Sequence, residues 1–304
     1  MALTAGSTSP AMLKEMRAPL GIYNVSTHRV LGKVERLAHQ LEVLFSSPDL
    51  LEQGNSGLAA PVVAAIDYME LAVYAAAEHV DDVAVIAEAY LPNKALRGKN
   101  SHFRKLENEI KQHKRLLSKL ANSIKHAHSR LRMFAADFWH DGRYVPLYGY
   151  FVEGAKGGVL GPTGLFHAEH KVFSASALPW EILEFIVATS RSLRDFIEKV
   201  RDVPVGPHAC TSDALSRAIV AAARLPLYAF NEPHPFDRST ISIAWGEGQL
   251  VAPLDSGLYG SFESGWSLST EHRTGRTKLA YEGDGVTRSF ALVHPTKVRF
   301  LWWR

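Results

Sequence analysis

The sequence predicts an α+β fold: an N-terminal helical bundle with a β-hairpin insertion, followed by a small antiparallel β domain. Three observations support this prediction. Apolar residues recur at three- and four-residue steps through most of residues 29–225, which is the helical period. An aromatic and glycine-rich stretch interrupts this pattern at about 144–174, and short apolar runs between glycine-rich turns occupy residues 239–304. Helices and strands that are segregated along the chain favour α+β over an alternating βαβ sheet.

The first helices follow from apolar spacing and from prolines. Residues 1–28 are expected to form a flexible arm, because Pro19 and Gly21 break any helix there. The spacing of apolar residues from about Leu31 predicts a helix that stops before Pro48. Residues 61–90 are rich in Ala, Val and Leu, so they predict one long or two shorter helices with much of their surface buried.

The middle of the chain predicts one long helix, a hairpin and two further helices. Residues 101–134 contain no Gly and no Pro and carry an apolar stripe, so we expect a helix that is broken at most once, near His113. The hairpin insertion follows at about 144–174, with its glycines at a mobile tip. Residues 180–200 and 211–224 predict two more helices.

The C-terminal β domain is predicted from six short runs of β-forming residues. They are residues 241–245, 249–252, 266–268, 278–281, 289–293 and 298–303. The dipeptide Asp284-Gly285 between two of these runs is a hairpin signal. The aromatic end of the chain, 300–304, is expected to be buried, because an exposed strand of this kind would promote aggregation.

The composition excludes several classes of protein. Of 304 residues, 46% are hydrophobic and 21% charged, as in ordinary globular proteins. The longest apolar runs, such as 59–65 and 71–77, are too short or too interrupted for a bilayer, which needs about 20 apolar residues, so we expect no membrane partner. The single cysteine, Cys210, excludes an internal disulfide and fits a reducing compartment. Without a secretory signal pattern, we predict a cytoplasmic protein.

The near-neutral net charge of +3 conceals two oppositely charged segments. Residues 94–132 hold twelve basic and two acidic residues, with four histidines between them, whereas residues 34–92 hold ten acidic residues and one basic residue. Two interpretations are open. The acidic helices can neutralise the basic one within the bundle or across a dimer, or the basic helix can present a surface to RNA or another polyanion.

The basic helix also predicts a candidate site. If residues 119–130 are helical, Lys119, Asn122, His126 and Arg130 fall on one face. His126 is then the candidate acid or base, Lys119 and Arg130 stabilise charge on a phosphate, and Asn122 orients the imidazole or an attacking hydroxyl. The residues expected to bind nucleic acid are Arg104, Lys105, Lys111, Lys114, Arg115, Lys125 and Arg132.

The segment from Lys119 to His126, with Asn122 between them, resembles the signature of the HEPN superfamily of helical-bundle proteins, many of them RNases of toxin–antitoxin, defence and CRISPR systems. The family signature is an arginine, often followed by a polar residue, then four to six residues and a histidine. The resemblance implies metal-independent cleavage of RNA, with two such motifs meeting across a homodimer. Here a lysine replaces the arginine, and lysine lacks the bidentate fork of a guanidinium.

Other kinds of site receive less support from the sequence. The pairs Asp137/His140 and His167/His170 do not form the two Glu-x-x-His pairs of a di-iron bundle, and we predict no metal and no cofactor. In the alternative interpretation, His126 pairs with an acidic residue of the bundle, such as Glu78 or Asp82. The predicted function is RNA binding with candidate endoribonuclease activity, as a homodimer or a subunit of a complex. The alternatives are a non-catalytic scaffold protein and a binder of a small anionic ligand.

Overall fold

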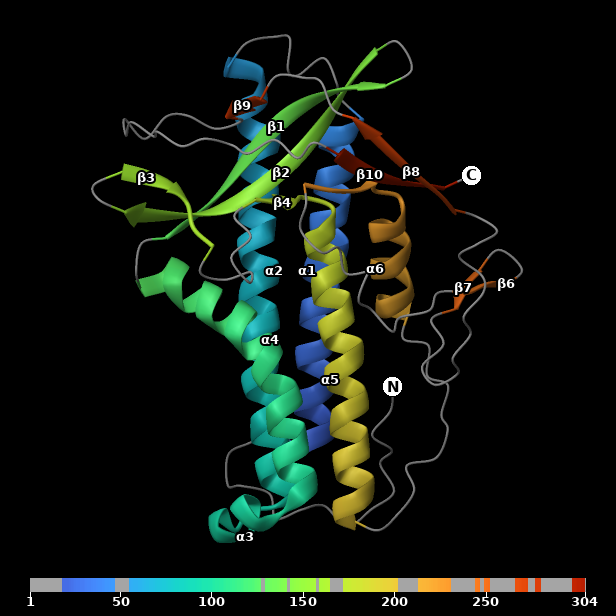
Figure 1. Ribbon diagram of the computed structural model, residues 1–304. Helices are drawn as coiled ribbons and strands as arrows, with labels where there is room; N and C mark the ends of the chain where they lie inside the picture. The colour runs from blue at the N-terminus through green and yellow to red at the C-terminus, as the bar shows by residue number, and fades with distance from the viewer. Residues whose placement is uncertain are drawn as a thin grey trace.

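The fold is α+β, as predicted, with a helical bundle below an antiparallel sheet in Figure 1. The structure is a computed structural model. It describes residues 18–46, 55–126, 129–140, 143–156, 159–164, 172–201 and 213–230, and the strand segments 244–246, 249–251, 266–272, 277–279 and 297–303. Of the predicted arm, residues 1–17 lie outside the described residues, and residues 19–28 are helical.

Helix α1 spans Pro19–Phe45 and starts about twelve residues before the predicted start at Leu31. Pro19 stands in the first turn, where its missing N–H leaves no hydrogen bond unmade. It therefore marks the beginning of the helix and does not break it. Helix α2 spans Asn55–Tyr90 and includes Pro61 within its second turn. The two helices pack along their lengths.

Four further helices complete the described helical part. Helix α3 spans Lys94–Lys99 and was not predicted; its N-cap, Asn93, accepts hydrogen bonds from the backbone N–H groups of Ala95 and Leu96. Helix α4 spans Ser101–His126 and bends partway along its length in Figure 1. Helices α5, Ala177–Arg201, and α6, Asp213–Ala223, agree with the predicted 180–200 and 211–224.

The β-hairpin insertion is longer than predicted and begins earlier. Strand β1, Arg130–His140, pairs antiparallel with β2, Arg143–Lys156, so the helix predicted over 101–134 ends at His126. The register joins His140 to Arg143, and the sequence between them, Asp141-Gly142, is a strong two-residue hairpin signal. Eleven residue pairs along the hairpin override the local helical pattern of residues 130–134.

Three further strands pair with the two strands of this hairpin. Strands β3, Val159–Pro162, and β4, Phe173–Ser174, pair with β2, and β9, Thr277–Leu279, pairs with β1. The other strands are β5, Leu227–Ala229, β6, Ala244–Gly246, β7, Gln249–Val251, β8, Trp266–His272, and β10, Lys297–Trp303. Strand β10 lies between β5 and β8, and β6 pairs with β7.

Five of the six predicted C-terminal runs overlap a strand, and the sixth, 289–293, lies outside the described residues together with Asp284-Gly285. The domain boundary at residue 239 stays a prediction. Strands from beyond it share sheets with earlier ones, because β9 pairs with β1 and β10 with β5.

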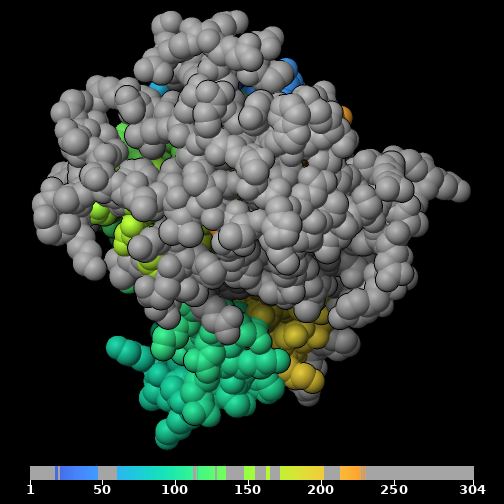
Figure 2. Space-filling view, turned by 45° about the horizontal axis from the view of Figure 1, so that its top comes forward, coloured from blue at the N-terminus to red at the C-terminus, as the bar shows by residue number. Residues whose placement is uncertain are grey.

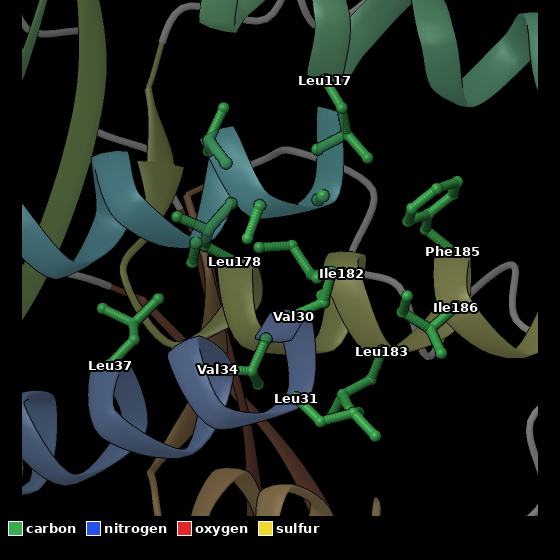
Figure 3. Close-up of a cluster of buried hydrophobic side chains, with 14 of the residues drawn as sticks. Val30, Leu31, Val34, Leu37, Leu117, Leu178, Ile182, Leu183, Phe185 and Ile186 are labelled. Carbon is green, nitrogen blue, oxygen red and sulfur yellow. The ribbon is translucent and has the colours of Figure 1, made fainter. Parts of the chain in front are cut away.

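One hydrophobic core runs through the bundle and beneath the sheet. It includes Leu31 and Leu37 of α1, Leu117 of α4, and Ile182 and Phe185 of α5, and Figure 3 shows these side chains converging. At the sheet end, the hydroxyl of Tyr228 donates a hydrogen bond to the carbonyl oxygen of Tyr148, beside the ring of Phe45. The core thus fixes α4 against the bundle and leaves its other side outward.

Helix α2 alone among the described helices is long and apolar enough, over residues 60–90, to span a membrane by length and composition. This length contrasts with the expectation that the apolar runs of this segment are too short or too interrupted to cross a bilayer. A core helix of a soluble bundle meets the same criterion, and Met69, Val73, Ala76 and Val80 of α2 are buried within this bundle.

Candidate nucleic-acid interface

Helix α4 carries most of the predicted site, and its sequence explains how it is held. The Oδ1 atom of Asn100 accepts a hydrogen bond from the backbone N–H of Phe103 at 2.9 Å, which caps the first turn. Contacts with α2 and with α5 hold two sides of the helix, and Figure 2 shows the surfaces of α4 and α5 side by side. Its buried face consists of Phe103, Leu106, Ile110, Leu117, Leu120, Ala121 and Ile124.

Opposite this buried face lies a line of polar residues that we call the outer row. Its members follow one another at three- or four-residue steps, which places them on one face of a helix. The described side chains of the outer row are all exposed, and the side chain of Arg115 lies outside the described residues. The outer row is Arg104, Asn108, Lys111, Arg115, Lys119, Asn122 and His126.

Three of the other predicted contact residues lie beside the outer row. Lys114 faces α2, with its Nζ atom 3.5 Å from Oδ1 of Asp81. Lys125 also faces α2, and its Nζ atom lies 4.7 Å from the centre of the Tyr74 ring. On the side of α4 that faces α5, the Nζ atom of Lys105 lies 3.8 Å from Oε1 of Glu109, which in turn contacts Ser192 of α5. These three cations therefore widen the charged surface on both sides of the outer row.

Neutralisation by the acidic helices is partial. Among the described residues, two ion pairs join the acidic segment to the basic one: Lys114 with Asp81, and Arg97 with Glu88 at 2.6 Å. Other acidic residues pair with bases outside residues 94–132, as Glu35 does with Arg217 at 3.1 Å. The question posed by the sequence is thus answered in part, because Glu35, Glu42 and Glu78 have basic partners outside the basic segment.

The structure corrects the placement of Arg130. Because α4 ends at His126 and β1 begins at Arg130, the helical spacing that placed Arg130 in line with Lys119 and His126 does not apply. Arg130 is exposed at the start of β1, where its guanidinium donates a hydrogen bond to the carbonyl oxygen of Ser129 at 3.2 Å. Lys119, Asn122 and His126 share the outer row, and Arg130 approaches from a different element.

Arg132 was predicted to bind nucleic acid, and the structure places it elsewhere. Its residue is 8% exposed, and its guanidinium contacts the carboxylate of Glu153 on β2 at 3.2 Å. A buried guanidinium that is committed to a buried carboxylate cannot reach a phosphate without leaving that carboxylate unpaired. The burial of Arg132 therefore opposes the predicted contact, and it follows from the pairing of β1 with β2, which brings Arg132 to Glu153.

Sequence reasoning missed a cluster beside the end of α4, formed by Glu70, Tyr74, Lys125 and Arg130, which we call the Glu70 corner. Burial raises the pKa of the Glu70 carboxyl above its ordinary value, and the nearby charge of Arg130 opposes this rise. Burial, followed by the charge of Glu70, raises the pKa of Tyr74. Sixty residues separate Glu70 from Arg130 in the chain, so no local signal joins them.

His126 is the last residue of α4 and is exposed. Basic side chains in the last turn of a helix interact favourably with its carbonyl end, so Lys125 and His126 have a structural role there. The alternative of a pair with Glu78 is not supported, because Glu78 pairs with Arg29 of α1. The contact between Lys114 and Asp81 shows that Glu78 and Asp82 lie at the level of the middle of α4.

Histidine and carboxylate groups give no metal site in the described part of the chain. His79, which the sequence places near Asp67 and Glu70, is instead fully buried, and its Nδ1 atom lies 2.8 Å from Oγ of Ser26. Burial lowers the pKa of His79 to about 4. The side chains of the other two candidate pairs, 137/140 and 167/170, lie outside the described residues.

Comparison with known proteins gives no relative. No family model matches the chain, and neither a curated protein nor a solved structure is significantly similar to it. The resemblance to the HEPN superfamily therefore remains a prediction that depends on Lys119, Asn122 and His126.

Proposed function

We propose that this protein binds RNA along the outer row of α4. The observation that supports the proposal is the alignment of exposed cations on one face, with Arg104, Lys111 and Lys119 each about two helical turns apart. Cations arranged in this way neutralise successive phosphates and release bound counterions, which is the main source of non-specific affinity for nucleic acid. Asn108 and Asn122 add hydrogen-bonding groups between the cations.

Charge balance within the bundle supports the same proposal. Neither Arg104 nor Lys111 forms an ion pair with another residue that the structure describes, whereas Lys105 and Lys114 have acidic neighbours. A row that served only to hold the bundle together would face the acidic helices. The described side chains of this row are exposed, while the apolar face of α4 packs in the core.

Metal-independent cleavage of the bound RNA is a second candidate function, favoured by the exposure of His126 beside Asn122 and Lys119. An imidazole can exchange a proton with the attacking 2′-hydroxyl or with the leaving oxygen, and an ammonium can stabilise the charge that develops on the phosphate. Since Arg130 is not on the same helix, its guanidinium would have to reach the phosphate from the start of β1. Binding therefore has the stronger support of the two.

One experiment tests both functions. The purified protein, the His126→Ala variant and the Lys111→Gln/Lys119→Gln variant are each incubated with total cellular RNA in the presence of EDTA. We expect the double variant to retain less RNA than the wild type. Cleavage by the wild type that is lost in His126→Ala would support the nuclease. Cleavage that persists in His126→Ala would remove His126 from that role, and RNA retention that is equal in all three proteins would contradict binding along the outer row.

A further inference from the structure

The short helix α3 is exposed along its length. It lies between α2 and the start of α4, at the end of the bundle opposite the sheet in Figure 1. None of its six residues is buried, and Lys94, Leu96 and Lys99 are exposed. Isolated helices shorter than about 12 residues are marginal in water, so a helix of this length that buries no residue needs another support.

Polar contacts at both ends of α3 supply part of this support. Asn93 caps the first turn. At the other end, the backbone N–H of Asn100 donates hydrogen bonds to the carbonyl oxygens of Leu96 and Arg97. The side-chain Oδ1 atom of Asn100 accepts a hydrogen bond from the backbone N–H of Phe103. The same residue therefore ends α3 and begins α4, which fixes the two helices to each other.

Arg97 ties α3 to the end of α2. Its guanidinium lies 2.6 Å from the carboxylate of Glu88 and donates a hydrogen bond to the carbonyl oxygen of Pro92 at 3.1 Å. The side chain of Arg97 is 19% exposed, so its charge is used within the fold. A guanidinium can serve two such acceptors because its donors point in fixed, different directions. Helix α3 thus keeps its position although it buries no residue.

The charges on α3 and at the start of α4 are of one sign. Residues 94–104 hold four bases and no acid. Among the described residues, Arg97 forms the ion pair with Glu88, whereas Lys94, Lys99 and Arg104 form none. Lys94 and Arg97 are also neighbours on the helix, and like charges at such a spacing destabilise it. The two lysines therefore add repulsion to the described fold, which an anionic partner would offset.

We propose that RNA bound along the outer row continues over α3, where Lys94 and Lys99 bind phosphates and Arg97 holds them in position. The inference rests on the proposed function, because it extends that same surface by one helix. Lys99 precedes Arg104, the first cation of the outer row, by five residues, with Asn100 between the two helices. Five residues span at most about 18 Å, so Lys99 lies within reach of a strand that contacts Arg104.

The test removes both charges in Lys94→Gln/Lys99→Gln. Binding of a labelled single-stranded RNA is measured between about 50 and 200 mM salt, a range over which phosphate contacts strongly affect affinity. The slope of log affinity against log salt should become shallower by about 1.4, about 0.7 for each lost phosphate contact. The loss of affinity across this range should then be about sevenfold smaller than for the wild type. The matched control, Lys33→Gln/Arg36→Gln, removes two charges from α1 and should keep the wild-type slope.

A charge-neutral exchange tests the positioning role of Arg97. Glu88→Gln/Arg97→Gln removes the ion pair and leaves the net charge unchanged. We expect the slope to become shallower in the folded variant, because lysines on a less firmly held helix contact phosphates less often. In a Lys94→Gln/Lys99→Gln background the exchange should have no further effect. A wild-type slope after the exchange, or an equal effect in both backgrounds, would overturn this role of Arg97.

Acetylation of lysines provides a second measurement that needs no variant. Bound RNA should slow the acetylation of Lys94 and Lys99, followed by mass spectrometry, and leave that of Lys33 on α1 unchanged. Acetylation of Lys94 and Lys99 at the same rate with and without bound RNA would contradict the proposed contacts.

The failure of this inference and the failure of the proposed function give different results. If Lys94→Gln/Lys99→Gln keeps the wild-type slope while Lys111→Gln/Lys119→Gln makes it shallower, RNA does not continue over α3 and the outer-row interface stands. If Lys111→Gln/Lys119→Gln binds as the wild type does, the proposed function itself fails.

Discussion

At the scale of single residues, Arg132 and Glu153 show how a charge in the sequence can be structural. Their side chains are 10% and 6% exposed and lie 3.2 Å apart across β1 and β2. Replacing Arg132 with Met would leave the carboxylate of Glu153 buried without its cation, which costs about 3–5 kcal/mol. We expect the free energy of unfolding in urea to fall by that amount, and the folded protein to retain its affinity for RNA.

A matched variant separates the ion pair from simple packing. Arg132→Met/Glu153→Leu removes both charges, and replacing a buried pair by apolar groups is often neutral. The double variant should therefore be more stable than Arg132→Met alone. If the single variant loses less than about 1 kcal/mol, or loses RNA binding while remaining folded, the structural role assigned to Arg132 is incorrect.

His79 predicts a sensitivity of the fold to acid. Its Nε2 atom has no hydrogen-bond partner within the described structure, and its ring lies between Tyr23 and Phe185. The pKa of His79 falls from 6.5 to about 4 in the fold, so the unfolded chain takes up a proton first as the pH drops. The contribution to stability is complete above about pH 6.5 and decreases toward pH 4, by up to about 3 kcal/mol.

The measurement for this prediction is the free energy of unfolding of the wild type and His79→Gln between about pH 7 and 4. His79→Gln should be less stable at neutral pH, because a buried polar contact with Ser26 is altered, but its stability should depend less on pH. An exposed histidine, replaced in His126→Gln, is the control. Equal pH dependence in the wild type and His79→Gln would show that His79 titrates normally.

At the scale of elements, the β1–β2 hairpin depends on one glycine. Gly149 pairs with Phe134, and a Cβ atom at position 149 would overlap the ring of Phe134. We expect Gly149→Ala to reduce stability by about 1–3 kcal/mol, the usual cost of overpacking. Phe134→Leu should restore part of this loss in the double variant, and thermal unfolding of the four proteins gives the comparison. Additive losses would contradict the predicted overlap.

The sequence predicted those elements that local patterns determine and missed those that depend on distant pairing. Helices α5 and α6 were found within a few residues, because their apolar stripes and their flanking prolines agree. The predicted end of α4 was wrong, since residues 130–134 continue an apolar helical pattern and become a strand only through pairing with β2. Asp141-Gly142 was the signal that could have located this hairpin.

The distinction between local patterns and distant pairing applies to the candidate site as well. The outer row could be predicted, because it depends on spacing within one helix. The positions of Arg130 and Arg132 could not, since they depend on the start of β1 and on its pairing with β2, which carries Glu153. The Glu70 corner brings together residues from α2, α4 and β1, and composition gives no indication of such a contact.

At the scale of the whole molecule, acidic and basic residues are concentrated on different helices. Acidic residues of α1 and α2 meet bases of α1, α3, α4 and α6, as in the pair between Glu35 and Arg217, while the described side chains of the outer row are exposed. The net charge of +3 is therefore compatible with a strongly basic surface on one helix. Salt screens exposed charges, so added salt should weaken the binding of a partner on the outer row far more than it lowers the stability of the fold.

The most direct test of the account is the salt dependence of RNA binding in Lys111→Gln/Lys119→Gln. Its control is Lys33→Gln/Lys199→Gln, which removes the same charge from α1 and α5. The account predicts that the slope of log affinity against log salt becomes shallower by about 1.4 in the outer-row variant, about 0.7 for each lost phosphate contact, and stays unchanged in the control. Equal slopes in the wild type and both variants would show that RNA does not bind along the outer row.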